Sequence, residues 1–508
     1  MPNQKITRAL ISVYYKDHLE PIIHALAAQG VEFVSTGGTQ AFIENLGYSV
    51  TPVEKLTGYP SIFGGRVKTL HPAVFGGILY RRELAADVAQ AEEFGIANID
   101  LVIVDLYPFE ETVAKGGTAD EIIEKIDIGG ISLIRAAAKN WNDVVIVASR
   151  NQYADLLALL HAKQGVTDAT DRKRLATHAF DVTSHYDTAI FHYFNREQQL
   201  PRLKESHQHS QVLRYGENPH QKGTFYGNLS DLFEQLHGKE LSYNNLVDTD
   251  AAVQLVQEFE GETAFVIIKH TNACGVATGS TVKEAYTKAF AADTLSAFGG
   301  VLATNQPVDL AAAEEINKLF FEILVAPSFT PDALTLLQTK KNRILLRQKN
   351  KLKLTHQVKT LLNGYIGQDA DWKTDAKEDL KPVTQRVPTA SQTEALLFAS
   401  KICKHTKSNT IILATEGQLL ASGVGQTSRV DALKQAIEKA KEFNMPLAGA
   451  VMASDAFFPF PDCVEIAWKA GIEAVIQPGG SIKDQDSIDF CNAHNVAMVF
   501  TGYRHFKH

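Results

Sequence analysis

The sequence predicts an α/β protein, in which strands and helices alternate. Short runs of β-branched and aliphatic residues, such as 101–104 and 264–268, are typical of buried strands. Segments of helical periodicity separate several of these runs, and a glycine-rich turn at 35–39 lies between a strand and the helix that follows it. In the first part of the chain, this alternation favours a parallel sheet that is covered by helices on both faces.

The first part of the chain contains the elements of one such sheet. Its opening strand, Arg8 to Val13, is followed by a helical pattern, and the next strand ends in a turn from which another helix begins. Two further apolar runs have the length and the β-branched content of buried strands. The expected strands are 8–13, 31–35, 101–104 and 144–147, with helices over 19–30 and from Thr39 onward.

A polar stretch over 195–211, rich in Gln, His and charged residues, separates this first part from the rest of the chain. We place the boundary near residue 200, so that the expected domains are 1–200 and 201–508. At about 150 residues per domain, the length is enough for about three folding units.

The second domain is expected to consist of two halves. A basic stretch at 340–353 and an acidic stretch at 369–379 indicate loops, and a seam at roughly 340–390 would divide the domain there. Strand signals occur on both sides of this seam. They are 264–268, 300–304, 323–326, 410–414 and 474–477.

The composition argues against several classes of function. The chain has 508 residues and a formal net charge of −8, so its overall field repels nucleic acids and acidic membrane surfaces. The four cysteines lie far apart without a Cys-x-x-Cys pair, which argues against a zinc site. Neither a signal peptide nor an apolar run long enough to cross a bilayer is visible. We therefore expect a cytoplasmic protein with small-molecule partners, without nucleic acid, membrane or catalytic metal.

A strand that ends on two basic side chains lies near the middle of the chain. The apolar run 265–268 leads directly into Lys269 and His270. A lysine can stabilise developing negative charge, and a histidine with a near-neutral pKa can accept a proton. Taken alone, the pair is equally compatible with a chance neighbourhood at a strand end.

Three glycine-containing segments of the first domain have the composition of anion-binding loops. Residues 35–39 read Ser-Thr-Gly-Gly-Thr, and residues 64–72 combine two glycines with Arg66 and Lys68. Residues 127–140 begin with Asp-Ile-Gly-Gly and continue into a helix. Glycines let backbone N–H groups approach an anion, and a helix N-terminus adds a favourable dipole. Taken singly, each segment could also be an ordinary turn or a solvated basic face.

Together with Leu106-Tyr107-Pro108-Phe109, these three segments resemble the inosine monophosphate (IMP) cyclohydrolase domain of the bifunctional purine-biosynthesis enzymes. The resemblance implies a methylglyoxal-synthase-like, Rossmann-type domain that closes a ring, with Lys139 as the catalytic acid/base. The implied contacts to the nucleotide are Tyr14, Lys16, Thr36, Gly37, Gly38, Thr39, Arg66, Val67, Lys68, Thr69, Val104, Asp105, Tyr107, Asp127 and Ile128.

The chain departs from the usual pattern of that family at two places. Tyr14-Tyr15-Lys16 stands where the family usually has Ser-Asp-Lys, and Asp105 stands where it usually has asparagine before Leu-Tyr-Pro-Phe. An ionised carboxylate cannot donate a hydrogen bond as an amide does. The contact of Asp105 with the base of the nucleotide is therefore expected to differ.

An ordered series of polar segments in the second domain resembles the aminoimidazole-carboxamide ribotide (AICAR) transformylase domain of the same family. These segments are 214–221, 241–248, 269–275, 296–300, 407–409, 423–430, 454–462, 477–481 and 503–508. The implied fold is a duplicated pair of cytidine-deaminase-like α/β halves that lack the zinc ligands. The implied co-substrate is 10-formyltetrahydrofolate, and the implied assembly is a homodimer.

The resemblance also assigns roles to individual residues of this domain. His270 is implied to be the base that takes a proton from the attacking amine, and Lys269 is implied to steady the oxyanion. The implied AICAR contacts are Arg214, Tyr215, Gly299, Glu322, Asn409, Arg429, Phe457 and Arg504, and the implied folate contacts are Val430, Asp462, Ser481 and Ile482.

The leading hypothesis is thus a bifunctional enzyme that transfers a formyl group to AICAR and then closes the ring to IMP. One alternative is a transformylase whose N-terminal domain is only a nucleotide-binding regulatory module, since this fold also serves as an effector domain. Another alternative is a binding or scaffold protein without activity. A ring-closure assay and substitutions of Lys269 and His270 would discriminate between these possibilities.

Overall fold

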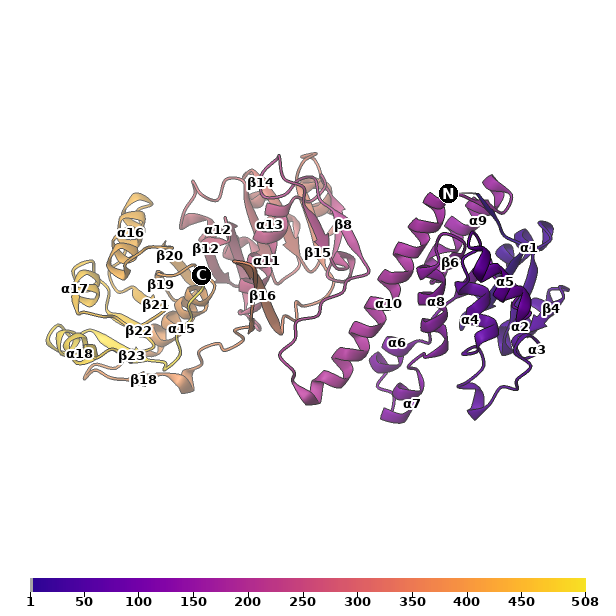
Figure 1. The fold of residues 1–508 in the computed structure, drawn as a ribbon. Helices are drawn as coiled ribbons and strands as arrows, with labels where there is room; N and C mark the ends of the chain where they lie inside the picture. The colour runs from indigo at the N-terminus through magenta and orange to yellow at the C-terminus, as the bar shows by residue number, and fades with distance from the viewer. Residues whose placement is uncertain (1–2) are drawn as a thin grey trace. The chain divides into compact units, whose positions relative to one another are not determined.

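The computed structural model describes residues 3–508 and divides into two compact units, one ending at Gln208 and one beginning at His209 (Figure 1). Each unit is an α/β structure, as predicted. In the first unit, β2 (Arg8–Ser12), β3 (Glu32–Ser35), β4 (Val50–Pro52), β5 (Leu101–Val104) and β6 (Val145–Val147) form a sheet with the order β4-β3-β2-β5-β6. Every pairing in this sheet is parallel, which confirms the expected parallel sheet.

Helices cover both faces of this five-stranded sheet. Alternate strand residues point to opposite faces, so Ile103 packs in one apolar core and Val102 in the other. The first core includes α1 (Glu20–Ala28), α2 (Gly37–Asn45) and α9 (Tyr153–Lys163). The second includes α3 (Val53–Thr57), α4 (Pro72–Leu79), α8 (Gly129–Lys139) and α10 (Ala169–Gln198). The remaining elements are β1 (Gln4–Lys5), η1 (Phe63–Gly65), α5 (Ala85–Glu93), α6 (Phe109–Ala114), α7 (Ala119–Glu124), η2 (Arg150–Gln152) and β7 (Val166–Thr167).

Helix α10 extends further than its polar sequence suggested. It begins with a capping box between Asp168 and Asp171 and continues through Gln198. Residues 195–198, which were expected to lie in the polar boundary segment, are therefore helical. The helix continues because its later apolar residues have packing partners of their own: Tyr186 packs with Phe109 of α6 and Ile122 of α7.

The second unit is built around one twelve-stranded sheet that contains the same series of elements twice. The first series is α11 (Tyr243–Gln257), β11 (Thr263–Lys269), β12 (Asn272–Gly279), α12 (Val282–Ala291), β13 (Gly300–Thr304), α13 (Leu310–Ile316), β14 (Phe321–Ala326), α14 (Pro331–Leu337) and β15 (Ile344–Gln348). The second is α15 (Ala390–Lys404), β19 (Ile411–Thr415), β20 (Gln418–Gly423), α16 (Arg429–Glu442), β21 (Val451–Ser454), α17 (Asp462–Lys469), β22 (Ala474–Gln477), α18 (Asp484–Ala493) and β23 (Ala497–Phe500). This repetition agrees with the expected duplicated α/β domain.

The two series share a single sheet because β12 pairs with β20 in antiparallel register, with Ala277 opposite Gln418. The strand order is β10-β15-β14-β13-β11-β12-β20-β19-β21-β22-β23-β18. On one face, α11 and α15 lie over one apolar core that includes strands of both series. On the other face, helices α12–α14 and α16–α18 cover two separate cores. The remaining elements are β8 (Ser210–Val212), β9 (Thr224–Tyr226), η3 (Leu229–Asp231), β10 (Phe233–His237), β16 (His356–Leu361), β17 (Gly364–Asp369), η4 (Lys377–Asp379) and β18 (Lys381–Pro382).

One feature of this unit differs from the expectation. The basic stretch 340–353 is not only a loop, because Ile344, Leu345 and Leu346 form the buried strand β15 between two neighbours. The expected seam contains an exposed hairpin, β16 and β17. The sheet of this unit is mixed, since β11 is antiparallel to both β12 and β13.

Candidate functional site

The first unit has a cavity of about 640 Å³ at the carboxyl ends of β2, β3 and β5. The N-termini of α2 and α8 both reach this cavity, which is where parallel α/β sheets commonly bind ligands. Most of the sequence-predicted nucleotide contacts lie in its lining. They are Tyr14, Lys16, Thr36, Gly37, Gly38, Thr39, Arg66, Lys68, Thr69, Val104, Asp105, Tyr107, Asp127 and Ile128.

Lys68 lies against the N-terminus of α2. A Cβ placed on Gly37 would be 3.7 Å from the Lys68 Nζ, and one placed on Gly65 would be only 2.8 Å from it. Gly65 also has a φ of +93°, which only glycine adopts readily. The first N–H groups of a helix have no intrahelical acceptor. The ammonium and these N–H groups therefore form one positive region, suited to a phosphate.

The hydroxyls near this region hold the loop rather than remain free. The Thr39 Oγ1 donates to the Val13 carbonyl at 3.0 Å and accepts from the Val13 N–H at 3.1 Å. The Thr36 Oγ1 lies 3.1 Å from the Ser12 Oγ. These contacts fix the start of α2 to the end of β2, so its backbone N–H groups are pre-oriented toward the cavity.

Asp127 shapes the second helix terminus. Its Oδ1 accepts from the Gly130 N–H at 2.6 Å, and a Cβ on Gly130 would lie 2.5 Å from the other carboxylate oxygen. The Tyr186 hydroxyl accepts from the Asp127 N–H at 2.9 Å and donates to the Lys125 carbonyl at 2.6 Å. Burial raises the pKa of the Asp127 carboxyl above its usual value. The site thus holds a rigidly placed acid whose proton affinity is increased.

Asp105 is a structural acceptor in this chain. Its carboxylate accepts from the backbone N–H groups of Tyr14 and Tyr15, the latter at 3.0 Å, and burial raises its pKa. A carboxylate offers two oxygens to these two donors, which gives a physical reason for an acid at this position. The Lys16 Nζ donates to the carbonyls of Val13 and Tyr14 in the same loop.

An aromatic corner lies at the mouth of the cavity. The rings of Tyr14 and Tyr107 are 5.8 Å apart in an edge-to-face arrangement, and they are 42% and 43% exposed. The Lys125 Nζ lies 5.3 Å from the Tyr14 ring centre. Sequence reasoning missed Lys125, which no motif distinguishes from a surface lysine. The exposed ring faces could stack on a heterocycle at the end of the cavity away from Lys68.

Three predicted residues are not positioned as free ligand contacts. Arg66 forms an exposed ion pair with Glu124. Val67 is outside the cavity lining, and its carbonyl accepts from Ile62 at 3.3 Å. Lys139 is exposed at the last residue of α8, about 15 Å along the helix from Gly129 at about 1.5 Å per residue. The sequence-predicted acid/base therefore lies at the opposite end of α8 from the cavity.

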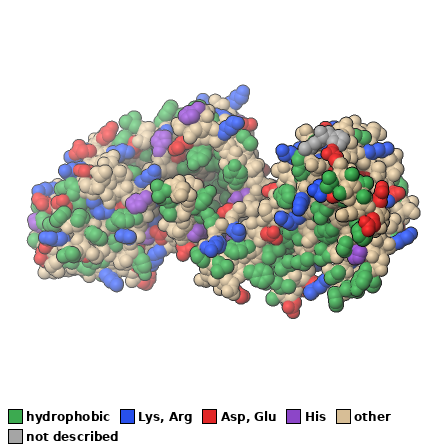
Figure 2. Space-filling view, in the orientation of Figure 1, with side chains coloured by type: hydrophobic (Ala, Val, Ile, Leu, Met, Phe, Trp, Pro, Cys, Tyr) green, Lys and Arg blue, Asp and Glu red, His purple; other side chains and the backbone are tan. Residues whose placement is uncertain are grey.

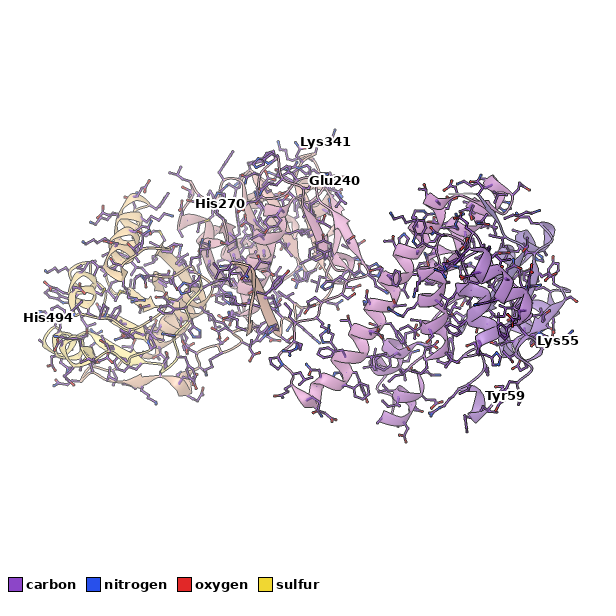
Figure 3. The ribbon with its side chains drawn as sticks, viewed as in Figure 1. Lys55, Tyr59, Glu240, His270, Lys341 and His494 are labelled. Carbon is purple, nitrogen blue, oxygen red and sulfur yellow. The ribbon has the colours of Figure 1, made fainter. Side chains whose placement is uncertain are left out.

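In the second unit, Lys269 ends β11, and His270, which is labelled in Figure 3, follows it directly. The Lys269 Nζ donates to the Phe298 carbonyl at 2.8 Å, and a Cβ on Gly299 would lie 3.2 Å from it. The pair is at the carboxyl end of its own strand, as expected. Because β11 runs antiparallel to β13, however, the same edge holds the amino ends of the parallel strands β13 to β15.

A second cluster joins three predicted AICAR contacts. The Arg429 Nη2 donates to the Asn409 Oδ1 and to the Asp455 Oδ1, each at 2.9 Å, while its Nη1 donates to the Phe457 carbonyl at 3.1 Å. Asp455 is fully buried, and its role was not predicted, although it lies in a segment that the sequence singled out. The Lys407 N–H donates to the Asn272 Oδ1 at 3.0 Å, which ties this cluster to the hairpin that follows Lys269.

The other predicted contacts of this unit have separate partners. Arg214 donates to the Tyr215 hydroxyl at 2.8 Å, Glu322 pairs with Lys239 at 2.6 Å, and the Arg504 guanidinium lies 4.9 Å from the Phe506 ring centre. Of the predicted folate contacts, Val430 packs against an apolar core, Asp462 begins α17, the Ser481 N–H donates to Asp484, and Ile482 is fully exposed. A cavity of about 710 Å³ in this unit, lined by residues such as Val256 and Lys401, contains none of them.

Lys and Arg side chains are interspersed with Asp and Glu over the face seen in Figure 2. Within residues 3–508, no group of three or more His, Cys, Asp or Glu side chains is arranged to hold a metal ion. Over the same residues, no helix is both long and apolar enough to cross a membrane. All four cysteines are buried and unpaired.

Comparison with known proteins gives full-length relatives. The family model described as AICARFT/IMPCHase bienzyme matches residues 137–439, and the MGS-like domain model matches residues 18–132. The bifunctional purine biosynthesis protein PurH of Bacteroides thetaiotaomicron is 60% identical over 100% of this chain and 99% of its own length. The PurH protein of Aquifex aeolicus is 49% identical over 99% of this chain and 100% of its own length. A solved structure titled "Crystal structure of ForH" is 33% identical, with a TM-score of 0.33, and covers 37% of this chain and 99% of its own. On the family match and the full-length identity, the chain belongs to the AICARFT/IMPCHase bienzyme family.

Proposed function

We propose that this chain catalyses two consecutive reactions of purine biosynthesis. The first is formyl transfer from 10-formyltetrahydrofolate to AICAR, and the second is the dehydrative ring closure of the formylated product to IMP. The observation that carries the proposal is the presence of two differently built sites, one in each unit, in a chain that is 60% identical to a PurH protein over its whole length.

Ring closure is assigned to the cavity of the first unit. The phosphate of the ribotide would lie at the N-terminus of α2 beside Lys68, and the heterocycle would lie near Tyr107 and Asp127. The carboxamide nitrogen then attacks the formyl carbon, a C–N bond forms, and the former carbonyl oxygen leaves as water. Because the reaction is intramolecular, orientation and stabilisation of the tetrahedral oxyanion should supply most of the acceleration.

Asp127 is the better supported acid/base of this step. It lines the cavity, is buried, and has a raised pKa, so it can hold a proton for the departing oxygen. The family resemblance implies this role for Lys139, which would require its ammonium to reach the reacting atoms. Within one chain, the position of Lys139 at the far end of α8 argues against such contact.

Formyl transfer is assigned to the edge of the second unit that carries Lys269 and His270. The amine of AICAR attacks the formyl carbon, and the bond from that carbon to the folate nitrogen breaks as that nitrogen takes up a proton. His270 takes the proton that the amine loses, which typically contributes about 10²–10⁴-fold. Lys269 stabilises the negative charge that develops on the formyl oxygen. The ammonium is already held over Gly299 by the Phe298 carbonyl.

The remaining contacts belong to the same proposal. AICAR would be held by Arg214, Tyr215, Gly299, Glu322, Asn409, Arg429, Phe457 and Arg504, and the folate by Val430, Asp462, Ser481 and Ile482. We further propose a cytoplasmic homodimer that uses no catalytic metal. As the family resemblance implies, some of these contacts would be supplied by the second chain.

Two assays test the proposal on the full-length protein. With AICAR and 10-formyltetrahydrofolate, ultraviolet absorbance should report formation of IMP. With the formylated ribotide alone, absorbance should report ring closure without any folate. If the first assay yields only the formylated product and the second shows no ring closure, the first unit would be a binding module. Inactivity in both assays would refute the proposal.

A further inference from the structure

The chain leaves β11 and returns in β12 through an unusually constrained two-residue turn. Lys269 and Asn272 are the last paired residues of the hairpin, so His270 and Thr271 form its loop. Their φ angles are +49° and +65°. Positive φ at both central residues is the requirement of the type I′ turns that close two-residue hairpins, where Asn-Gly is usual. A β-branched residue such as Thr271 rarely adopts this conformation.

The imidazole of His270 is not held by a side-chain partner. Among the hydrogen bonds of residues 3–508, neither ring nitrogen of His270 has a donor or acceptor. The direction of the ring therefore depends on the backbone of the turn. The contacts that keep His270 and Thr271 at positive φ therefore also orient the imidazole.

The turn is held chiefly from α11. The Asp248 Oδ1 accepts from the Thr271 N–H at 2.7 Å, across the space between helix and hairpin. The His270 carbonyl accepts from the Asn272 Nδ2 at 2.9 Å and from the Thr271 Oγ1 at 2.6 Å, but both of these donors belong to the hairpin itself. Asp248 thus connects the backbone of the turn itself to helix α11.

The charge of Asp248 also lies close to the two basic residues. Burial raises its pKa, while the Thr271 N–H and the positive charges of His270 and Lys269 oppose that rise. The carboxylate therefore lies within electrostatic range of both side chains. It touches the backbone of the turn rather than any position where a substrate would react.

We propose that Asp248 is a positioning residue for formyl transfer, which acts by holding the His270–Thr271 turn through the Thr271 N–H. The inference rests on the proposed function of Lys269 and His270. It assigns a role to a residue of the segment 241–248, in which the sequence analysis identified no site residue. A misplacement of about 1 Å at a reacting group can cost about 10²-fold in rate, so loss of this contact should reduce turnover.

The test uses three variants of the full-length protein. Asp248→Ala removes the acceptor, whereas Asp248→Asn retains an oxygen that can accept from Thr271. Asp250→Asn is the matched control, because Asp250 lies on the same helix and bonds to Gln254 rather than to the turn. For each, kcat and KM for formyl transfer and the melting temperature are measured.

We expect Asp248→Ala to lower kcat about thirtyfold to a hundredfold while both KM values change less than about threefold. Asp248→Asn should lose only about threefold, and Asp250→Asn should match wild type. In a crystal of Asp248→Ala, residues 270 and 271 should leave the positive φ region. If Asp248→Ala does not fold, the proposal is decided by Asp248→Asn, whose kcat must stay within about tenfold of wild type.

Two outcomes would overturn the inference. One is a wild-type kcat in Asp248→Ala. The other is an equal loss of kcat in the asparagine and alanine variants, because the effect would then come from the charge of Asp248 and not from its contact with Thr271. An inactive wild-type protein would instead refute the proposed transformylase function, so the two failures are distinguishable.

Discussion

The contact between Gly65 and Lys68 gives a sharp test of the anion site in the first unit. A methyl group added by Gly65→Ala would lie 2.6 Å from the Lys68 Cε and 2.8 Å from its Nζ. Ordinary contact between carbon atoms begins near about 3.5 Å, so the end of the lysine must move by about 1 Å. Because the lysine is flexible, we expect it to swing away from α2 rather than to unfold the loop.

The size of the effect follows from the interaction that is lost. A hydrogen bond to a charged group contributes about 1.5–3 kcal/mol, which corresponds to about a tenfold to a hundredfold change in affinity. We therefore expect Gly65→Ala to raise the KM for the formylated ribotide by this factor. The φ of +93° at Gly65 adds a loss of stability of about 1–2 kcal/mol, which a melting curve would detect.

The assay is ring closure without folate, followed by ultraviolet absorbance at increasing concentrations of the formylated ribotide. The matched control is Gly58→Ala, since Gly58 has a φ of +65°, no neighbour within 4 Å and no place in the cavity lining. It should lower stability without changing KM. Equal KM values for the two variants, or a further rise in KM when Lys68→Ala is added to Gly65→Ala, would refute the reasoning.

Other expectations concern the catalytic groups and pH. His270→Ala should abolish formyl transfer and spare ring closure, because the two sites belong to different units; loss of both activities would contradict separate sites. Asp127→Asn should lower the kcat of ring closure about 10²-fold, and this loss should exceed the loss in Lys139→Ala. A larger loss in Lys139→Ala would instead identify Lys139 as the acid/base. Burial opposes protonation of His505, but hydrogen bonds and charges of Asp371 and Asp375 outweigh it and raise its pKa to about 9 from 6.5. This ion pair stabilises the fold fully below pH 6.5 and loses its effect as pH rises through about 9, so the melting temperature should fall over that interval in wild type but not in His505→Ala.

The fold was predictable where a short apolar run is bounded by turns. The strands near residues 8, 32, 101 and 145 all have this form, and the structure contains them within a residue or two. Strand β15 was hidden because its apolar core of only three residues is flanked by lysines that dominate the local composition. Strand β12 was missed because its small residues, such as Ala273 and Gly275, do not produce an apolar signal.

The candidate site was predictable to the extent that chemistry follows local sequence. The glycine segments and Lys68 meet in one cavity. Only 35–39 directly follows a strand, β3, whereas 64–72 comes after α3 and 127–130 after α7, so their meeting depends on tertiary packing. The catalytic role of Lys139 came from the family resemblance and not from its local sequence, and the structure places Lys139 at the end of α8 opposite the cavity. The role of Asp248 depends on a contact 23 residues away, which no local pattern encodes.

The apolar core beneath α11 and α15 makes the two repeated series of the second unit depend on each other. Residues from both series, such as Val256 and Ile402, contribute to the same interior. Neither series can therefore bury this face alone, and a fragment cut at the repeat junction would expose it to water.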